Sequence, residues 1–426
     1  MWRTFRVFQD RISYSQKSGG DLTTKKKPFE GYRVVDFGWV WAGTVLGHIL
    51  ADYGAEVIKV ESKRRIDGLR LGKVFEVGTT LELNTFFHNL NRNKLSITLD
   101  INQPRGVEII KELVQKSQIV VENFTPTVLE RHGLGYESLA KVKPDIIMIS
   151  MSAAGHNGPL SNIVTYAPII SALSGIDSLI GYPGDKPLGF KHAYCDPTAS
   201  LVGTFATLAA LRYHSKTGKG QHIDLSQWEV TTSLIGEAVM DYTMNGRVQK
   251  LLGNHHPTMA PHGNYPCQGD DKWVSIAVKT DSEWKGLCKA MGNPPWTKET
   301  KFADRFGRLS YTVELDQYIA EWTSGYTDYE VAEILQKAGV AATPVLSTDA
   351  VFLEPHFNER EIFTYVEHPV VGGEAVYNLP WKAHNVPRQP TKPAPTLGQH
   401  NNYVFSKILG LSQEEIMELE EEKVIY

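Results

Sequence analysis

The chain has 426 residues, of which 42% are hydrophobic and 22% are charged, and its formal net charge at pH 7 is −4. A chain of this length exceeds one ordinary hydrophobic core and predicts two domains, and its composition is typical of a globular enzyme. The small negative charge gives no argument for nucleic acid or an anionic membrane as a partner, and no apolar run of 18 residues predicts a transmembrane helix.

Residues 1–28 are polar and basic and lack the apolar core of a signal peptide. We expect an extension over the surface or onto a partner subunit; a transit peptide is an alternative that its acidic residues weaken. The three cysteines, Cys195, Cys267 and Cys288, show neither a C-x-x-C motif nor a zinc-like spacing. We therefore expect a cytoplasmic protein without disulfides.

The first predicted unit is a strand, a loop, a helix and a second strand. These are residues 32–37, 38–44, 45–53 and 56–61, with Gly54 ending the helix. Such a unit predicts a parallel sheet with a right-handed crossover, whose ligands bind beyond the carboxyl ends of the strands. Because no G-x-G-x-x-G motif lies in the first turn, a dinucleotide site is not expected.

Strands and helices continue to alternate after this unit. We predict strands at 97–99, 119–121, 145–150 and 221–226, and helices at 103–115, 198–214 and 227–245. This alternation predicts an α/β, Rossmann-like large domain with a parallel sheet, whose first part covers residues 29–227.

A smaller α/β domain is expected at residues 228–340. We predict a strand at 273–278, helices at 282–291 and 329–338, and polar helical structure at 292–326. Residues 341–426 should return to the large domain, through an ordered proline-rich connector at 387–395 and an acidic helix at 412–422. His255, His256 and His262 have no acidic partner at ligand spacing, so no metal site is expected.

A single carboxylate, Asp196, stands directly before Pro197 at the start of the predicted helix 198–214. Proline fits the first turn of a helix, where its missing N–H group would have no partner. Asp196 therefore lies at a helix entrance, where free N–H groups and partial positive charge favour a carboxylate. A plain N-cap is the alternative interpretation of this position. The apolar and small residues that follow predict a mostly buried helix.

Four stretches resemble the class III CoA-transferases, the formyl-CoA transferase or CaiB/BaiF-like family. They are residues 32–61, 91–100, 121–135 and 194–226. In that family the aspartate at the place of Asp196 is the nucleophile, which passes through a mixed anhydride and an aspartyl-CoA thioester. The resemblance implies acyl-CoA and a carboxylic acid as substrates, with no tightly bound cofactor and no metal.

The resemblance also implies a set of residues that bind CoA. They are Val40, Trp41, Ala42, Lys63, Leu99, Asn123, Phe124 and Arg131. Asn123 would bond the adenine or ribose, Phe124 would give a flat apolar surface, and Arg131 would pair with phosphate. Lys63 and its neighbours Arg64 and Arg65 have a second interpretation, a solvated charge cluster.

Several positions depart from the family pattern. Thr44 replaces a proline, and Ala167 replaces a carboxylate that commonly lies near the active site. Tyr166 stands where the related acyl-CoA racemases have a histidine, and tyrosine is a poor general base at neutral pH. We therefore expect a transferase, with a racemase or a non-catalytic CoA-binding subunit of a heteromeric transferase as alternatives.

The resemblance further implies how the chain assembles and which acids it uses. Family members have two subunits interlocked like linked rings, so we expect a homodimer or a heteromer with a related subunit. The loop 38–44 is similar to that of benzylsuccinate CoA-transferase subunits, which suggests succinyl-CoA as donor and an aromatic or dicarboxylic acceptor. Trp39, Trp41 and Tyr166 would line the acid pocket or, alternatively, pack in the core.

Overall fold

The structure is a computed structural model, which describes residues 26–71, 81–383, 386 and 391–426. Expectations for residues 1–25 and 387–390 lie outside these ranges. The chain divides into two compact units: the first runs up to Ile176 and includes Phe190–Gly236 and Arg360–Tyr426, and the second comprises Asp177–Gly189 and Glu237–Glu359. Of the residues expected in the smaller domain, 237–340 lie in the second unit.

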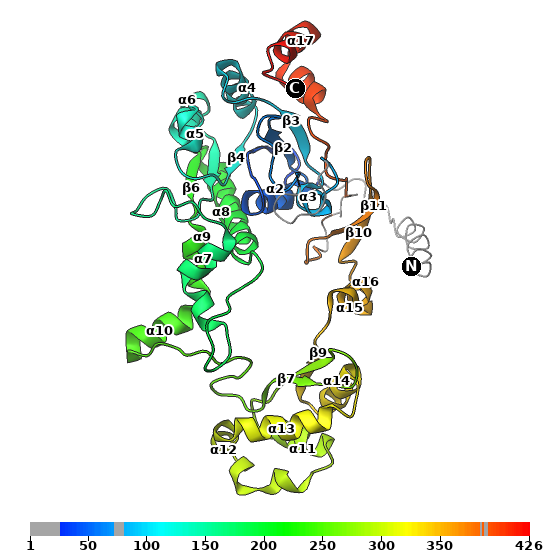
Figure 1. Cartoon of the computed structure of the whole chain (residues 1–426). Helices are drawn as coiled ribbons and strands as arrows, with labels where there is room; N and C mark the ends of the chain where they lie inside the picture. The colour runs from blue at the N-terminus through cyan, green and yellow to red at the C-terminus, as the bar shows by residue number, and fades with distance from the viewer. Residues whose placement is uncertain (1–25, 72–80, 384–385, 387–390) are drawn as a thin grey trace. The chain divides into compact units, whose positions relative to one another are not determined.

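The first unit is built on a parallel sheet, as predicted (Figure 1). Its strands are β1 (Arg33–Asp36), β2 (Glu56–Glu61), β3 (Leu95–Thr98), β4 (Ile119–Glu122), β5 (Ile147–Ser150) and β6 (Gln221–Asp224). They lie in the order β3-β2-β1-β4-β5-β6, and every neighbouring pair is parallel. The chain order reverses between β1 and β4, where α/β proteins of this class bind their ligands.

Helices and a C-terminal segment complete the first unit. The helices are α2 (Ala42–Asp52), α3 (Thr85–Asn91), α4 (Pro104–Gln115), α5 (Val128–Arg131), α6 (Tyr136–Val142), α7 (Ala167–Ser174), α8 (Cys195–Thr217), α9 (Gln227–Ser233) and α17 (Gln413–Glu421). A hairpin of β10 (Phe363–His368) and β11 (Gly372–Tyr377) and a π-helical turn at Tyr403–Leu409 follow in the returning chain. No helix within the described ranges is long and apolar enough to cross a membrane.

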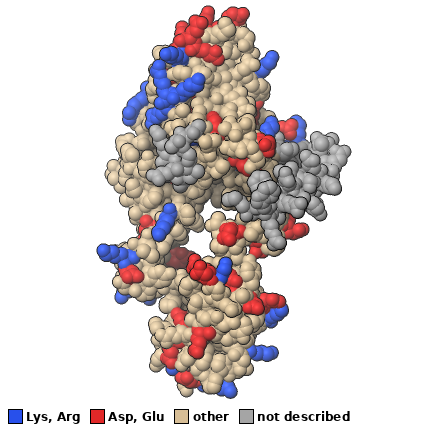
Figure 2. Space-filling model, turned by 45° about the vertical axis from the view of Figure 1, so that its right-hand side comes forward, with Lys and Arg blue, Asp and Glu red and all other residues tan. Residues whose placement is uncertain are grey.

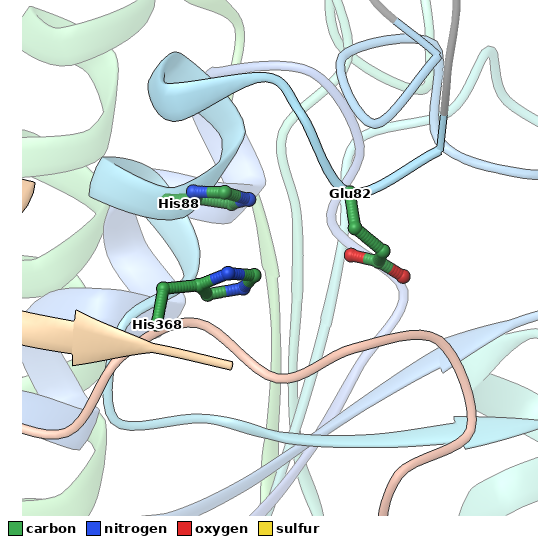
Figure 3. Close-up of side chains that lie close together, drawn as sticks. All are labelled: Glu82, His88 and His368. Carbon is green, nitrogen blue, oxygen red and sulfur yellow. The ribbon is translucent and has the colours of Figure 1, made fainter. Parts of the chain in front are cut away.

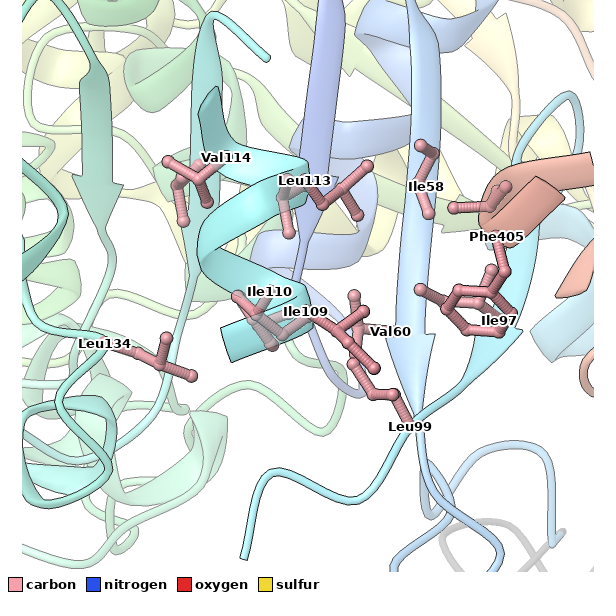
Figure 4. Close-up of a cluster of buried hydrophobic side chains, with 14 of the residues drawn as sticks. Ile58, Val60, Ile97, Leu99, Ile109, Ile110, Leu113, Val114, Leu134 and Phe405 are labelled. Carbon is pink, nitrogen blue, oxygen red and sulfur yellow. The ribbon is translucent and has the colours of Figure 1, made fainter. Parts of the chain in front are cut away.

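The core lies on both faces of the sheet because the strands alternate their side chains between two apolar layers. In β4, Val120 points into one layer while Val121 points into the other, and both are fully buried. The first layer is closed by the apolar side of α4, including Leu113, and by Phe405 of the returning chain (Figure 4). The second layer is closed by α2 and α8. Packing in both layers holds the carboxyl ends of the strands in place.

Two helix predictions were wrong in part. Residues 227–245 form two helices, α9 and α10 (Gly236–Asn245), because the β-branched Thr231 and Thr232 weaken the helix before Gly236. Helix α8 is buried only on its small-residue side, at Ala199 and Gly203. Its opposite side is exposed in the single chain, and Phe205 there is 73% exposed.

The second unit combines an antiparallel sheet with helices. Its strands are β7 (His262–Pro266), β8 (Trp273–Ala277) and β9 (Ala341–Pro344), in that order. Its helices are α10, α11 (Asp281–Ala290), α12 (Arg305–Ser310), α13 (Thr312–Thr323), α14 (Asp328–Lys337), α15 (Thr348–Leu353) and α16 (Pro355–Glu359). Residues 292–326, expected to be polar, contribute Phe302, Leu315 and Ile319 to the core of this unit.

Candidate active site

Asp196 lies in the first turn of α8, at the predicted helix entrance. It is not the N-cap: Tyr194 occupies that position, and its side chain makes no capping hydrogen bond. The Ser200 hydroxyl donates to the carbonyl oxygens of Ala42 and Asp196, at 2.7 Å each. Because Ala42 is the first residue of α2, this bond joins the starts of two helices. The carboxylate of Asp196 therefore lies close to two helix N-termini.

The pKa of Asp196 is raised from its usual value to about 6, because burial disfavours the charged form. Hydrogen bonds from its own backbone N–H and from that of Ala42 oppose this rise. Among the described residues, no charged side chain contributes to the shift. The carboxylate is thus mostly ionised at pH 7 while it is poorly solvated, a state suited to a nucleophile.

The loop before α2 holds the predicted residues Val40, Trp41 and Ala42. Val40 has a positive φ of 57°, and Trp41 is the N-cap of α2. Asn123, directly after β4, pairs with the backbone of Trp39 through both halves of its amide: Oδ1 accepts from N–H at 2.8 Å, and Nδ2 donates to the carbonyl at 3.0 Å. Asn123 and the loop therefore meet at the switch point of the sheet.

The aromatic side chains of this region pack on one another. The rings of Trp39 and Phe124 meet edge to face with centroids 5.4 Å apart, and the Arg65 guanidinium lies over the ring of Trp39, 5.3 Å from its centroid. Trp41 packs in the same way on Phe86, at 5.0 Å. The two tryptophans thus have protein partners in addition to any part they take in binding an acid.

Lys63 lies near the C-terminus of the chain. With Arg64, Glu420, Lys423 and Tyr426 it lines an open depression of about 590 Å³. Its ammonium group is 5.7 Å from the ring of Tyr426, and Arg64 pairs with the buried Asp100 at 3.1 Å. Figure 2 shows Lys and Arg side chains gathered below a group of acidic side chains at the top of the view. An exposed basic group of this kind attracts phosphates.

The other two predicted CoA-binding residues do not line this depression. Leu99 is 1% exposed and its side chain belongs to the core, so it has no free surface for a ligand. Arg131 ends the short helix α5, is exposed, and donates to the Thr127 hydroxyl at 2.9 Å. The structure therefore brings six of the predicted site residues together at β1 and β4, namely Val40, Trp41, Ala42, Asn123, Phe124 and Asp196. Lys63 and Leu99 instead follow β2 and β3.

The substituted position Ala167 is the first residue of α7. Its carbonyl oxygen accepts from the Cys195 thiol at 3.6 Å, so the starts of α7 and α8 are neighbours. The neighbouring Tyr166 is the N-cap of α7 and is 72% exposed. A carboxylate at position 167 would thus stand beside the first turn of α8, where Asp196 lies.

Buried charges below the loop were not predicted from the sequence. Asp36 ends β1, Lys59 lies inside β2, and Lys94 precedes β3; each is fully buried. Asp67, in the segment after β2, is also fully buried. The sequence does indicate one of these charges. Lys59 stands between an isoleucine and a valine in a predicted buried strand, and a lysine there needs a charged partner. Which partner it has depends on the fold.

His156 precedes Tyr166 by ten residues in the chain. It follows β5, and its Nε2 lies 3.6 Å from Oε1 of Glu122 at the end of β4. Its backbone N–H donates to the Asp224 carboxylate at 3.0 Å. The nearby Glu122 carboxylate raises the pKa of His156. This histidine therefore belongs to an acidic cluster at the carboxyl ends of β4 and β6.

One group within the described ranges has the spacing of metal ligands. The ligand atoms of Glu82, His88 and His368 lie within 4.8 Å of one another, and all three residues are buried (Figure 3). His88 Nδ1 lies 2.9 Å from the Glu374 carboxylate, which leaves a lone pair on Nε2. The rings of His88 and His368 are stacked with centroids 3.9 Å apart.

The partners of this group argue against a metal. His368 Nδ1 accepts from the Val370 N–H at 3.2 Å, so its Nε2 carries the proton and has no lone pair for a metal. The Glu82 carboxylate already pairs with Arg70 and accepts from the Leu397 N–H. Of the two imidazoles, only His88 keeps a free lone pair, so the group offers one nitrogen ligand instead of two. We assign the group to packing between α3, the hairpin and the returning chain.

Comparisons with known proteins identify the family of this chain. The family model described as CoA-transferase family III matches residues 29–401. Succinyl-CoA–D-citramalate CoA-transferase of Chloroflexus aurantiacus is 32% identical over 400 residues, covering 94% of this chain and 98% of that protein. The beta subunit of succinyl-CoA–L-malate CoA-transferase from the same organism is 32% identical and covers 95% and 100%.

Solved structures give the same result. A CAIB/BAIF family protein from Brucella suis superposes with a TM-score of 0.81 at 29% identity, covering 90% of this chain and 100% of that one. The resemblance inferred from the four sequence stretches is confirmed. The chain belongs to CoA-transferase family III and is an enzyme of this class.

Proposed function

We propose that this enzyme transfers CoA from succinyl-CoA to a dicarboxylic acid, with Asp196 as the covalent nucleophile. The observation that carries the proposal is the Asp196 carboxylate itself. It is partly buried, meets the Ala42 N–H, and has a pKa of about 6 without help from a charged side chain among the described residues. A carboxylate that is ionised but poorly hydrated is well suited to attack a carbonyl carbon.

The reaction proceeds in four substitutions. Asp196 attacks the succinyl thioester carbon, the C–S bond breaks, and CoA leaves as a thiolate from a mixed anhydride. The thiolate attacks the Asp196 carbonyl carbon and expels succinate, which forms an aspartyl-CoA thioester. The acceptor carboxylate then attacks this thioester to give a second anhydride and free thiolate. The thiolate finally attacks the acceptor acyl carbon, which releases the new acyl-CoA and restores Asp196.

The start of α2 supplies groups that suit the charge developing in these steps. The first α-helical hydrogen bond of α2 runs from the Val45 N–H to the Trp41 carbonyl. The N–H groups of Ala42, Gly43 and Thr44 therefore have no partner inside the helix. Backbone N–H groups fixed in this way stabilise oxyanions without reorganisation. The Ala42 N–H already lowers the pKa of Asp196, which supports a role for this turn beside the proposed nucleophile.

The choice of acids rests on the relatives and on the loop. Two relatives carry names that combine succinyl-CoA with a small dicarboxylate, D-citramalate or L-malate. Trp39 and Trp41 flank the loop residue Val40, and an aromatic dicarboxylate such as benzylsuccinate is a second acceptor to test. The three cysteines are buried and form no disulfide within the described residues, which supports the proposed cytoplasmic location. Lys63, Asn123, Phe124 and Arg131 are the proposed contacts of CoA, which is a substrate here.

An exchange assay tests the activity. The purified enzyme is incubated with succinyl-CoA and one acid at a time, D-citramalate, L-malate, glutarate or benzylsuccinate, and the acyl-CoA products are identified by mass spectrometry. We expect a new acyl-CoA from at least one acid, and none from Asp196→Ala. Deuterium uptake at the α-carbon of a branched acyl-CoA without any exchange would instead identify a racemase.

We also propose that α8 packs against a second copy of the chain. Its side away from the sheet carries exposed apolar residues, Leu201, Val202, Phe205 and Leu208. A helix that is apolar on all sides is normally buried, so this side needs a covering surface.

Light scattering after gel filtration tests this assembly. We expect a mass of about twice the chain mass of 47.6 kDa. Phe205→Glu should yield the monomer, whereas Phe306→Glu, at an equally exposed position on α12, should leave the dimer intact. A monomeric wild-type protein would contradict the proposal. A protein that dimerises only with a related chain would show that α8 packs against a heteromeric partner instead of a second copy.

A further inference from the structure

Two ion pairs are buried beneath the loop before α2. Lys94 Nζ lies 2.7 Å from Asp36 Oδ2, and Lys59 Nζ lies 2.9 Å from Asp67 Oδ2. All four side chains are fully buried. Charges are buried at a considerable cost unless each is paired and hydrogen-bonded. Their presence under one short loop needs an explanation beyond packing.

Each of the four side chains also bonds to the backbone of the loop. Asp36 accepts from the Gly38 N–H at 2.7 Å, Lys59 donates to the Gly38 carbonyl at 2.6 Å, Asp67 accepts from the Val40 N–H at 3.2 Å, and Lys94 donates to the Thr44 carbonyl at 3.0 Å. Asn123 holds both polar groups of the residue between them, Trp39. The backbone at residues 38–40 thus has a side-chain partner at nearly every polar group.

The loop conformation is one that its sequence does not favour. Val40 has a φ of 57°, in the left-handed region that β-branched residues avoid. Such a residue persists only where the surroundings over-determine it, and it is found mostly at functional sites. The bonds to Gly38, Trp39 and Val40 supply this constraint.

Glycines make room for the charges. A Cβ atom on Gly38 would lie 2.6 Å from Asp36 Oδ1, and one on Gly47 would lie 2.7 Å from Asp36 Oδ2 and 3.0 Å from Lys94 Nζ. A Cβ atom on Gly43 would lie 2.8 Å from the Cα of Gly38. The loop and the charges are therefore fitted to each other at contact distance.

We propose that Asp36, Lys59, Asp67 and Lys94 are positioning residues, which hold the backbone of residues 38–44 so that the Ala42 N–H faces the Asp196 carboxylate. The inference rests on the proposed role of Asp196 as nucleophile. The four side chains act through the loop: Lys94 fixes it at Thr44, two residues after Ala42, and Lys59 and Asp67 fix it before Ala42.

The acidity of Asp196 reports whether this hydrogen bond is kept. The Ala42 N–H lowers the pKa of Asp196, so its loss should raise that pKa further. Titratable or charged groups lie on α8 and at its N-cap (Tyr194, Cys195, Arg212, Tyr213, His214 and Lys216), before α7 (Tyr166), and on the contacting elements α2, α9 and β6 (His48, Asp52, Glu229, His222 and Asp224). None of them is a cause of the shift in the pKa of Asp196. The acid limb of a labelling profile is the pH range in which the rate of labelling falls as Asp196 takes up its proton. A change in this acid limb therefore indicates a change in the loop.

The test compares the pH dependence of covalent labelling by succinyl-CoA among matched variants. Asp67→Ala removes the acceptor of the Val40 N–H. A double variant, Lys59→Met with Asp67→Leu, removes both charges without leaving one unpaired, so that it folds even if Asp67→Ala does not. Val114→Ala, in the core on the other face of the sheet, controls for general destabilisation.

We expect the acid limb of labelling in Asp67→Ala and in the double variant to move up by about one pH unit, because a hydrogen bond to a charged group has about this effect. Val114→Ala should keep the wild-type limb. An unchanged limb in the folded double variant, or an equal shift in Val114→Ala, would overturn the inference. Failure of the wild-type enzyme to label would instead overturn the proposed nucleophile, and the two failures are thereby distinguished.

Discussion

The acidity of Asp196 predicts how fast succinyl-CoA labels the enzyme at different pH values. With a pKa of about 6, about one-tenth of the carboxyl is ionised at pH 5 and about nine-tenths at pH 7. Only the ionised form attacks the thioester, so the labelling rate at low succinyl-CoA should rise about tenfold over this range. An ordinary aspartate is already ionised at pH 5 and would give an almost constant rate.

The rate is measured by quenching the labelling reaction at intervals and determining the mass of the intact protein by mass spectrometry. All pH values use one mixed buffer of constant ionic strength. Circular dichroism at each pH verifies that the protein stays folded. His156 is the matched control, because its pKa is also raised and it also follows a strand of the central sheet. His156→Asn should keep the limb near pH 6. A rate that does not change between pH 5 and pH 7, or a limb that moves in His156→Asn, would refute the reasoning.

Three further predictions concern stability, measured as the free energy of unfolding in urea. Asp196→Asn should be more stable than the wild type at pH 7 by up to about 3 kcal/mol, because a raised pKa means that the folded state disfavours the charge. The difference should vanish below about pH 4, where both states hold the proton, and a wild type more stable at pH 7 would contradict it. Gly47→Ala should lose about 3–5 kcal/mol because its Cβ atom displaces the Asp36–Lys94 pair, whereas Gly236→Ala, with open space around its Cβ atom, should lose nothing. Leu113→Ala, in the layer closed by α4, should cost about 2–5 kcal/mol, and a cost below about 1 kcal/mol would show that this layer is not closely packed.

The strands of the central sheet could be predicted from the sequence because a strand buried on both faces appears as a continuous apolar run. Residues 56–61 coincide with β2, and residues 119–121 lie within β4. The start of α2 was placed three residues late, because Gly43 is a weak helix former and obscures the start. The break between α9 and α10 was missed because the apolar pattern continues across it.

The candidate site could be predicted only in part. Asp196 was placed at a helix entrance from the proline that follows it, but its first-turn position and its bond to Ala42 depend on how α2 and α8 pack. The pairing of Lys94 with Asp36 joins residues 58 positions apart, and no local pattern encodes such a pair. The partner of Asn123 was missed for the same reason, since Trp39 precedes it by 84 positions.

The central claim is that CoA becomes bound to Asp196. The direct measurement is the intact mass of the enzyme after incubation with succinyl-CoA, followed by peptide mapping, beside Asp196→Asn. The account predicts an added mass equal to CoA less one water molecule, located on the peptide that contains Asp196 and absent from the variant. An unmodified wild-type protein that still exchanges CoA between acids, or an adduct at another residue, would contradict it.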